Sequence, residues 1–578
     1  MATITKLRDP NTLSNYDKFR TRHIAANFKI NFEKKRLEGN VVLNLEVLDR
    51  AKEVVLDSSF VDLQDVTLNG SAVKWKLEER SEPFGSPLKV EIGDNIEIGK
   101  EIVLDDTPDV KATVQFKIES PLPVIASGLP RDISSSSSDT SIYHFEQKVP
   151  IPSYLFALAS GDIKTAEIGP RSNVATGPDE LAAAKWEMEE DMERFIVAAE
   201  KILGSVPYAW GTYNVLVLPP SFPYGGEYND MPFHWMENPV YTFATPSIIS
   251  GDKENIDVVA HELAHSWSGN LVSACSWEDF WLNEGWTVYL ERRILAAVHN
   301  EPFRDFSSII GWKALTDSVN HFGEEHEFTK LIPNLKGRDP DDAFSSIPYE
   351  KGFTFLFYLE KLVGKEKFDT FIPHYFNKFA RKSVDSQEFK QTFIDFFSTD
   401  PEASDQIQKI DWDTWYYAPG FPPKPDFDTS MVDMAYKLAD KWESRSKGET
   451  QFTPHADDIK GLSANQIVVL LEKVQLFEPS ISAEDARTMG QAYGLSKSQN
   501  LELTTRYYQI ALVAGDKTAY GPAAELLGHI GRMKYVRPLY RKLKAADEEL
   551  AKETFRRHEA FYHPICRQMI RQDLFSDK

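Results

Sequence analysis

Cysteine is nearly absent from this sequence. Only Cys275 and Cys566 occur among 578 residues, which is too few for a disulfide framework. A reducing, intracellular compartment therefore fits the composition best.

Long hydrophobic runs are also missing. No window holds the roughly 18 uncharged apolar residues that a membrane span needs. The N-terminal stretch MATITKLRDPNTLSNYDKFRTRH contains no apolar signal segment. We expect a soluble cytoplasmic protein without a membrane span.

Basic residues are in the minority. Lys and Arg number 65 against 88 Asp and Glu, so the formal net charge is -23. This excess of negative charge favours solubility and argues against nucleic acid as the main partner. The length leaves room for two to four domains of ordinary size.

Three zones with different hydrophobic patterns follow one another along the chain. From about Phe28 to Pro170, segments such as NVVLNLEVL and ATVQFKIE alternate apolar with polar residues, which predicts β-strands in a sandwich or saddle. Strands and helices then mix as far as about Trp415. Beyond Asp428, amphipathic patterns such as SANQIVVLLEKVQLF favour a solenoid of stacked helices.

We therefore predict an α+β multidomain protein. The expected parts are an N-terminal β domain (1–166), a mixed domain that holds the recognisable chemistry (167–417), and a C-terminal all-α, HEAT- or armadillo-like domain (428–578). The linker between the last two (418–427) lies in YYAPGFPPKPDF, whose prolines favour an extended, exposed connection.

A candidate metal site lies in NIDVVAHELAHSWSGN. On a helix, His261 and His265 are four residues apart and project from one face, with Glu262 beside them. Glu284 of FWLNEGWTVYLERRIL follows after a gap of eighteen residues, on a second helical pattern that can fold back on the first. Two imidazoles and a carboxylate suit zinc and leave a fourth position for water, which is typical of a catalytic site. Glu262 then remains free to act as a general base.

A purely structural role is the alternative for these residues. In that case His261 and His265 are packed core histidines and Glu262 is an ordinary helical residue. A third ligand at a suitable spacing argues against this alternative. The nearby acids Glu278 and Asp279 have no comparable support, and we expect them at the surface.

The motifs HELAHSW and LNEG, with their spacing, resemble those of the M1 zinc aminopeptidases. Within that family the chain is similar to the leukotriene A4 hydrolase group and its fungal homologues, the leucine aminopeptidases 2. Segments that carry this resemblance in the same order along nearly the whole chain are FEQKVPIPSYLFALASGDI, LPPSFPYGG, DPDDAFSSIPYEKGF, DWDTWYYAPGFPP, GRMKYVRP and YHPICRQMIRQDL.

The resemblance implies a fold and an activity. The implied fold is an N-terminal β saddle, a thermolysin-like zinc catalytic domain and a C-terminal helical solenoid. The implied activity is the removal of N-terminal residues from short peptides in the cytoplasm. It leaves open a nuclear location and a second activity, that of an epoxide hydrolase acting on leukotriene A4-like fatty-acid lipids.

The resemblance also implies roles for single residues. His261, His265 and Glu284 match the ligands of one Zn2+ per chain, and Glu262 matches the general base that takes a proton from the attacking water. Tyr349 of SSIPYEKG matches the tyrosine that donates a hydrogen bond to the tetrahedral oxyanion. A structural tyrosine beneath a turn is the alternative for Tyr349.

The segment MENP matches the part of the family that binds the substrate. Its residues Met236, Glu237 and Asn238 are therefore expected to contact a peptide, and Glu237 matches the acid that binds the free α-amine. Glu237 keeps a spacing of twenty-four residues to His261.

A glycine pair precedes MENP, and the distance between them departs from the family. In the family the pair, here Gly225 and Gly226, runs directly into the methionine and brings backbone amides close to the substrate. In this chain the nine residues EYNDMPFHW intervene. We expect the insertion to bulge away at the loop, which leaves His234 and Trp235 where glycines belong, with Trp235 large enough to fill the first pocket.

Two further positions match residues that hold longer substrates. Arg532 and Lys534 of GRMK match the basic pair that receives a substrate carboxylate, whether of a tripeptide or of a fatty acid.

Asp341 matches the acid that directs water onto the lipid in the epoxide hydrolase reaction. Phe344 stands where vertebrate lipid-processing members have tyrosine, which favours peptide hydrolysis over formation of leukotriene B4.

The N-terminal domain also departs from the family. In EIVLDDTPDVKATVQF, two segments are joined directly near 104–105, where the family has about forty more residues. If those residues form strands, their loss leaves an unpaired edge on the sheet. The missing part includes a Gln-rich stretch that helps to hold the substrate. Faulty exon boundaries in a translated gene would explain both the insertion and this gap.

Two functions remain on these grounds. The first is a zinc aminopeptidase. The alternative is a catalytically impaired scaffold that binds zinc, because the loop between the glycine pair and MENP is disrupted.

Overall fold

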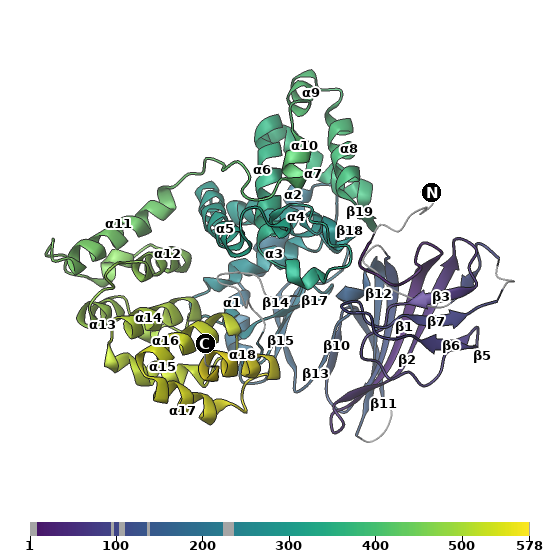
Figure 1. The fold of residues 1–578 in the computed structure, drawn as a ribbon, viewed down its shortest axis with the longest axis horizontal. Helices are drawn as coiled ribbons and strands as arrows, with labels where there is room; N and C mark the ends of the chain where they lie inside the picture. The colour runs from purple at the N-terminus through teal and green to yellow at the C-terminus, as the bar shows by residue number, and fades with distance from the viewer. Residues whose placement is uncertain (1–8, 94–96, 103–109, 136–138, 224–235, 577–578) are drawn as a thin grey trace.

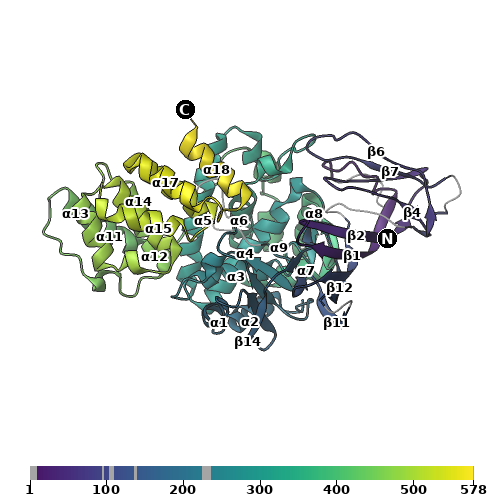
Figure 2. The same cartoon turned by 90° about the horizontal axis from the view of Figure 1, so that it is seen from below.

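The computed structural model describes residues 9–93, 97–102, 110–135, 139–223 and 236–576. Figures 1 and 2 show an N-terminal β domain, a mixed domain in the centre and a C-terminal helical domain along the long axis of the molecule. This arrangement confirms the predicted multidomain α+β architecture. Within the described ranges, no helix combines the length and the apolar character needed to cross a membrane.

The N-terminal domain is built on a six-stranded sheet with the order β11-β12-β9-β1-β2-β8. Strand β9 alternates buried and exposed residues, as the period-two pattern predicts, and buries Val114, Phe116 and Ile118. The strands of this sheet are β1 (Phe19–Asn31), β2 (Arg36–Val47), β8 (Glu101–Ile102), β9 (Ala112–Ser120), β11 (Leu129–Ser135) and β12 (Ser141–Ile151). Smaller sheets contain β3 (Glu53–Leu56), β4 (Thr67–Leu68), β5 (Ser71–Ala72), β6 (Trp75–Leu77), β7 (Leu88–Glu91), β10 (Val124–Ala126) and β13 (Leu158–Ser160).

Within the described residues, the outer edge of β2 has little strand pairing. Strand β8 pairs with β2 only at Leu45 and Glu46. The apolar side chains of Leu37, Val41 and Val42 are exposed on the part of β2 before this pairing. Across the described ranges no other strand joins this edge. The expected junction near 104–105 lies outside the described residues, so the shortened domain stays a prediction.

The central domain opens with a four-stranded sheet in the order β14-β15-β16-β17. Its first strand spans the expected domain boundary after residue 166, so the sheet favours a boundary just before Lys164. The strands are β14 (Lys164–Gly169), β15 (Ser172–Thr176), β16 (Asn214–Val217) and β17 (Tyr241–Ala244), with β18 (Val272–Ala274) and β19 (Lys382–Val384) paired separately. The helices are α1 (Leu181–Met188), α2 (Met192–Leu203), α3 (Val258–Ala264), α4 (Trp281–Val298), α5 (Glu301–Phe322), α6 (Gly352–Val363), α7 (Lys365–Phe379), α8 (Ser386–Phe397), α9 (Pro401–Ile407) and α10 (Trp412–Tyr417).

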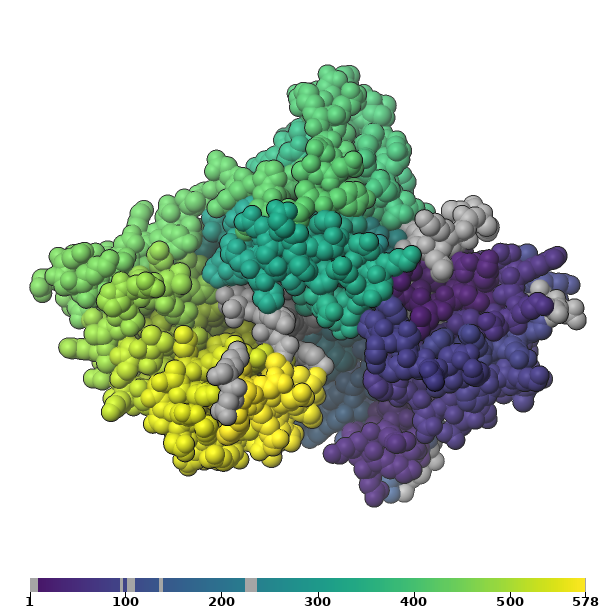
Figure 3. All heavy atoms as spheres, viewed as in Figure 1, coloured from purple at the N-terminus to yellow at the C-terminus, as the bar shows by residue number. Residues whose placement is uncertain are grey.

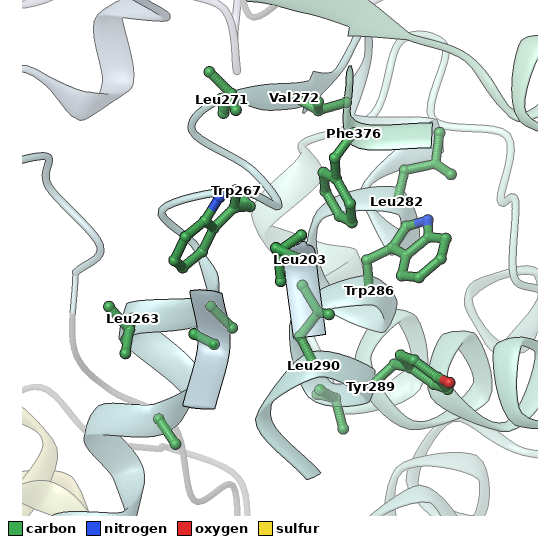
Figure 4. Close-up of a cluster of buried hydrophobic side chains, with 14 of the residues drawn as sticks. Leu203, Leu263, Trp267, Leu271, Val272, Leu282, Trp286, Tyr289, Leu290 and Phe376 are labelled. Carbon is green, nitrogen blue, oxygen red and sulfur yellow. The ribbon is translucent and has the colours of Figure 1, made fainter. Parts of the chain in front are cut away.

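A hydrophobic cluster holds α3 against α4. Figure 4 shows Leu263 of α3 and Trp267 of the following loop near Leu203 of α2, with Trp286 and Leu290 of α4 close by. Trp267 and Trp286 are fully buried, and burying a large apolar side chain stabilises the fold by about 1.5–3 kcal/mol. This packing fixes the distance between the two helices that carry the HELAH and LNEG motifs.

The C-terminal domain is entirely helical in its described part, as predicted. In Figure 3 it lies against the central domain on the side opposite the β domain. Polar contacts join the two domains, including hydrogen bonds from Asn500 to Asp252 and Asn255. The helices are α11 (Ser430–Ser446), α12 (Ala464–Gln475), α13 (Ala483–Ala492), α14 (Leu501–Val513), α15 (Tyr520–Leu527), α16 (Met533–Ala546), α17 (Glu548–His558) and α18 (Pro564–Phe575).

The proline-rich linker between α10 and α11 has no regular structure, but it is anchored. Lys351 Nζ donates hydrogen bonds to the carbonyls of Ala418 at 2.9 Å and Gly420 at 3.0 Å. The same ammonium binds the carbonyl of Thr329 at 2.8 Å. The linker therefore follows the surface of the central domain instead of hanging free.

Candidate active site

The histidines of HELAH and the glutamate of LNEG meet between α3 and α4. His261 Nε2 lies 3.2 Å from His265 Nε2, and Glu284 Oε2 lies 3.6 and 3.3 Å from these two nitrogens. Zinc bonds of about 2.0–2.1 Å in a tetrahedral site imply ligand–ligand distances of about 3.3–3.4 Å. The three donors therefore fit one zinc ion.

Two buried carboxylate oxygens support the same conclusion. Glu262 Oε2 and Glu284 Oε2 are inaccessible and make no hydrogen bond within the described structure. Leaving a buried charged oxygen without a partner is costly, whereas a cation or a bound water satisfies it.

Each imidazole is oriented by an oxygen on its far side. His261 Nδ1 lies 2.9 Å from Glu291 Oε2, and His265 Nδ1 lies 2.9 Å from the carbonyl oxygen of Ser268. Because these oxygens accept a hydrogen, Nδ1 is the donor and the lone pair of Nε2 faces the centre of the cluster. Glu291 was not among the predicted site residues, although it lies seven residues after Glu284 on the same face of α4.

The site favours positive charge. Burial lowers the pKa of His261, but Glu284 and Glu291 outweigh it and raise the pKa to about 10. Burial raises the pKa of Glu262 to about 7 against the opposing effect of the two histidines. The carboxylates that stabilise protonated imidazoles would stabilise a divalent cation in the same way, because a metal ion competes with protons for the same lone pairs.

Tyr349 lies against the histidine cluster. It belongs to a π-helical turn, η7 (Ile347–Lys351), and its ring stacks on His261 with centroids 6.0 Å apart and planes at 21°. The neighbouring Glu350 is held by both terminal nitrogens of Arg292 at 2.9 Å each, and both residues are buried. This bidentate ion pair fixes the turn that places Tyr349 beside the metal donors.

The MENP segment runs beside the cluster. The backbone of Met236 pairs with Phe243 of β17, with N–O distances of 3.1 and 3.0 Å. The ligand atoms of Glu237, Glu262 and His265 all lie within 4.8 Å of one another. Burial raises the pKa of Glu237.

Asn238 and Asn270 complete this side of the site. Asn270 Nδ2 donates to the carbonyl oxygen of Glu237 at 2.7 Å. Asn238 is buried, and its Nδ2 has no hydrogen-bond partner within the described structure. Asn270 was not predicted as a site residue, and its place five residues after the second histidine is the one sequence signal that could have found it.

Four residues of the predicted substrate loop lie outside the described residues. These are Gly225, Gly226, His234 and Trp235. The expected bulge and the filling of the first pocket by Trp235 therefore stay predictions.

Arg532 and Lys534 lie where the C-terminal domain meets the central domain. Arg532 immediately precedes α16 and is buried; its Nη1 donates to Ser247 Oγ at 2.7 Å, while its Nε and Nη2 make no hydrogen bond in the described structure. Lys534 Nζ is paired with Glu502 Oε1 at 2.7 Å. Both basic residues line a cavity of about 190 Å³ between the two domains. Glu502 neutralises the lysine, whereas no described residue accepts a hydrogen bond from these two arginine nitrogens.

Asp341 lies outside the histidine cluster. It is exposed on a 3-10 turn, η6 (Pro340–Ala343), at a cavity of about 390 Å³ that Trp277, Phe280 and Phe344 also line. The rings of Phe280 and Phe344 both make edge contacts with Tyr349. This aromatic cavity therefore lies beside the candidate oxyanion donor.

The expectation that Glu278 and Asp279 are surface acids is wrong for Asp279. Asp279 is buried and accepts hydrogen bonds from the backbone of Ser386 and from Ser276 Oγ, each at 2.9 Å. Glu278 is partly buried and accepts from the backbone of Leu335 at 2.8 Å. Ser386 and Leu335 are far away in the sequence, so neighbouring residues gave no sign of this burial.

Comparisons with known proteins agree with this geometry. The sequence model of the Peptidase family M1 domain matches residues 186–415, and that of the Peptidase M1 N-terminal domain matches residues 103–155. The model described as Leukotriene A4 hydrolase, C-terminal, matches residues 462–574.

Fungal relatives cover the whole chain. Leucine aminopeptidase 2 of Coccidioides immitis is 55% identical over 621 aligned positions, which cover 99% of this chain and 98% of the relative. The Leukotriene A-4 hydrolase homolog of Botryotinia fuckeliana is also 55% identical, with coverage of 99% and 95%. The first alignment is longer than the 578 residues of this chain, so that relative contains residues without a counterpart here.

Solved structures show the same similarity. Yeast LTA4 hydrolase in complex with bestatin superposes with a TM-score of 0.88 at 41% identity, covering 99% of this chain and 98% of that chain. An M1 zinc metallopeptidase from Deinococcus radiodurans, at 18% identity, shares the fold with a TM-score of 0.53 over 71% of this chain and 96% of that chain. The chain therefore belongs to the M1 zinc metallopeptidase family, within the group formed by the leukotriene A4 hydrolases and the fungal leucine aminopeptidases 2.

Proposed function

We propose that this protein is a zinc aminopeptidase that removes N-terminal residues from short peptides. The observation that carries the proposal is the convergence of His261, His265 and Glu284 on one point. Glu262 and Glu237 lie beside that point. Membership of a peptidase family and the aminopeptidase names of its relatives support the same activity.

The Nε2 atoms of His261 and His265 and the carboxylate of Glu284 would hold one Zn2+ per chain. When bound, zinc supplies a Lewis acid that polarises the peptide carbonyl and lowers the pKa of water. The contacts of the two Nδ1 atoms keep both imidazoles in the tautomer that can bind it.

Glu262 moves the proton. Its carboxylate takes a proton from the attacking water and gives it to the amine that leaves. The hydroxyl of Tyr349 donates a hydrogen bond to the oxyanion, a type of contact that lowers the barrier by about 2.7–4 kcal/mol.

Substrate length is limited at both ends. The carboxylate of Glu237 binds the α-ammonium of the first residue, so a blocked or internal residue leaves this acid buried and unpaired. At the other end, Nε and Nη2 of Arg532, which make no hydrogen bond within the described residues, form a planar fork that suits a carboxylate. Short peptides with two free ends fit this arrangement best.

Matched substrates test the aminopeptidase activity. We expect a leucine fluorogenic amide to be hydrolysed and its N-acetylated form to be left intact. Glu237→Gln should reduce hydrolysis of the free-amine substrate, and Glu402→Gln, the same change at an exposed position, is the matched control and should leave it unaltered. Equal hydrolysis of the free and acetylated substrates would exclude an aminopeptidase.

An epoxide hydrolase activity on leukotriene A4-like lipids is the second candidate. The aromatic cavity beside Tyr349 favours it, because an apolar lipid chain fits such a lining and Asp341 stands among the residues around it. Phe344 places no hydroxyl there, so we expect this activity to be weaker than peptide hydrolysis. Incubation with leukotriene A4 and analysis of the diol products, with Asp341→Asn in parallel, tests this second activity.

The impaired scaffold is tested by the same assays. A chain that binds zinc but hydrolyses no aminoacyl amide would fit the scaffold. Sequencing the transcript decides whether the nine-residue insertion and the gap near 104–105 are encoded, and a cDNA with both features would rule out faulty exon boundaries. Cytoplasmic and nuclear locations remain predictions that microscopy of a tagged chain can check.

A further inference from the structure

The Lys111 side chain of the N-terminal β domain reaches a loop beside the active site. Lys111 immediately precedes β9, and its Nζ donates hydrogen bonds to the carbonyl oxygens of Asn270 and Leu271, both at 2.9 Å. These two residues belong to the loop that follows the second histidine of HELAH. The lysine thus joins two domains at a point close to the metal donors.

The two carbonyls differ in what else holds them. The carbonyl of Leu271 also accepts from the backbone of Arg381 at 2.7 Å. Among the described residues, the carbonyl of Asn270 accepts a hydrogen bond from Lys111 alone. Loss of the lysine would therefore release Asn270 more than Leu271.

Asn270 connects this loop to the candidate amine anchor. Its backbone N–H donates to the carbonyl of His265 at 3.1 Å, and its side chain donates to the carbonyl of Glu237 at 2.7 Å. Asn270 is buried, so neither contact is replaced readily by water. Met236, the residue before Glu237, is held separately by its backbone pairing with β17.

We propose that Lys111 is a positioning residue for Glu237: it fixes Asn270, and Asn270 fixes the main chain from which the Glu237 carboxylate reaches the substrate amine. This inference rests on the proposed amine-binding role of Glu237. It gives the N-terminal domain a direct part in recognising a free N-terminus, beyond its own packing.

A pair of inhibitors separates positioning from general stability. Leucine hydroxamate and its des-amino analogue, 4-methylpentanohydroxamate, differ only in the amine, so the ratio of their inhibition constants measures recognition of that amine. We expect Lys111→Met to reduce the preference for leucine hydroxamate about tenfold, which is the size of one lost positioned contact. Lys117→Met, on an exposed position of β9, should leave the ratio unchanged.

A double mutant tests whether Lys111 acts through Glu237. Glu237→Gln alone should reduce the ratio, and adding Lys111→Met should reduce it no further, because coupled residues are not additive. If Lys111→Met does not fold, Asn270→Ala removes the side-chain donor to Glu237 and should give the same loss of preference.

The outcomes distinguish the two proposals. If Glu237→Gln lowers the ratio and a folded Lys111→Met leaves it unchanged, the positioning role is overturned while the amine anchor stands. If Lys111→Met does not fold, an unchanged ratio in Asn270→Ala overturns the positioning role in the same way. If Glu237→Gln leaves the ratio unchanged, the amine anchor is wrong and the role of Lys111 falls with it. Equal weakening of both hydroxamates by Lys111→Met would show a structural contact without positioning.

Discussion

Replacing Glu291 by glutamine tests how strongly the surroundings of His261 tune the metal site. The Glu291 carboxylate lies 2.9 Å from His261 Nδ1 and is buried. Glutamine keeps the length and one acceptor oxygen but removes the negative charge. The imidazole of His261 then becomes a weaker electron-pair donor to a cation at Nε2. Removing such an outer contact typically lowers metal affinity about 10- to 100-fold, or about 1.4–2.8 kcal/mol.

The assay is a competition titration for Zn2+ against a chelator of known affinity at one pH. Thr287→Val is the matched control, because His265 keeps its 2.9 Å contact with the Ser268 carbonyl when the Thr287 hydroxyl is lost. We expect a smaller change in that variant. An unchanged affinity in Glu291→Gln, or an equal loss in both variants, would refute the idea that the carboxylate tunes His261.

Three further predictions concern catalysis, packing and pH. Tyr349→Phe should lower kcat about 10²- to 10³-fold with little change in KM, because the hydroxyl acts on the transition state; steady-state kinetics check this. Gly285→Ala places a Cβ 2.8 Å from the backbone of α6 and should cost about 1–3 kcal/mol in urea unfolding, whereas Gly521→Ala meets no atom within 4 Å and should not destabilise. Burial raises the pKa of Glu502, but Lys534 and its neighbours outweigh it and hold the pKa well below the usual value. The free energy of unfolding that this lowered pKa contributes is present above the unfolded-state pKa of about 4.3 and is lost as the pH falls from there toward the folded-state pKa. The free energy of unfolding of Glu502→Gln should therefore depend less steeply on pH in the acid range.

The metal donors could be predicted because their geometry is local. His261 and His265 are one helical turn apart, so a helix alone brings them together. Glu284 reaches the two histidines if a second helix folds back on the first, and the apolar residues of both segments favour that packing. The three zones of the chain were equally visible, since β9 alternates with period two and α12 follows the helical period.

The contacts around these donors depend on the tertiary fold. Lys111 lies 159 residues from Asn270, and Asp279 is buried by Ser386 from 107 residues away. No pattern within a short window reveals such pairs. Glu291 is the exception, because its spacing of seven residues from Glu284 places both on one face of α4.

The pairing of Lys534 with Glu502 also required the structure. Sequence similarity placed Arg532 and Lys534 together as a basic pair for a carboxylate. The folded chain distinguishes them, because the lysine is neutralised by Glu502, while Nε and Nη2 of Arg532 make no hydrogen bond in the part of the chain that the structure describes.

The most direct test of the proposed activity compares the unmodified chain with Glu262→Gln, both loaded with zinc. Zinc content and hydrolysis of a leucine fluorogenic amide are measured on the same samples. We predict one zinc ion per chain in both proteins and a loss of hydrolysis of about 10²- to 10⁴-fold in Glu262→Gln. Zinc binding without hydrolysis by the unmodified chain, or equal hydrolysis by both proteins, would contradict the proposed function.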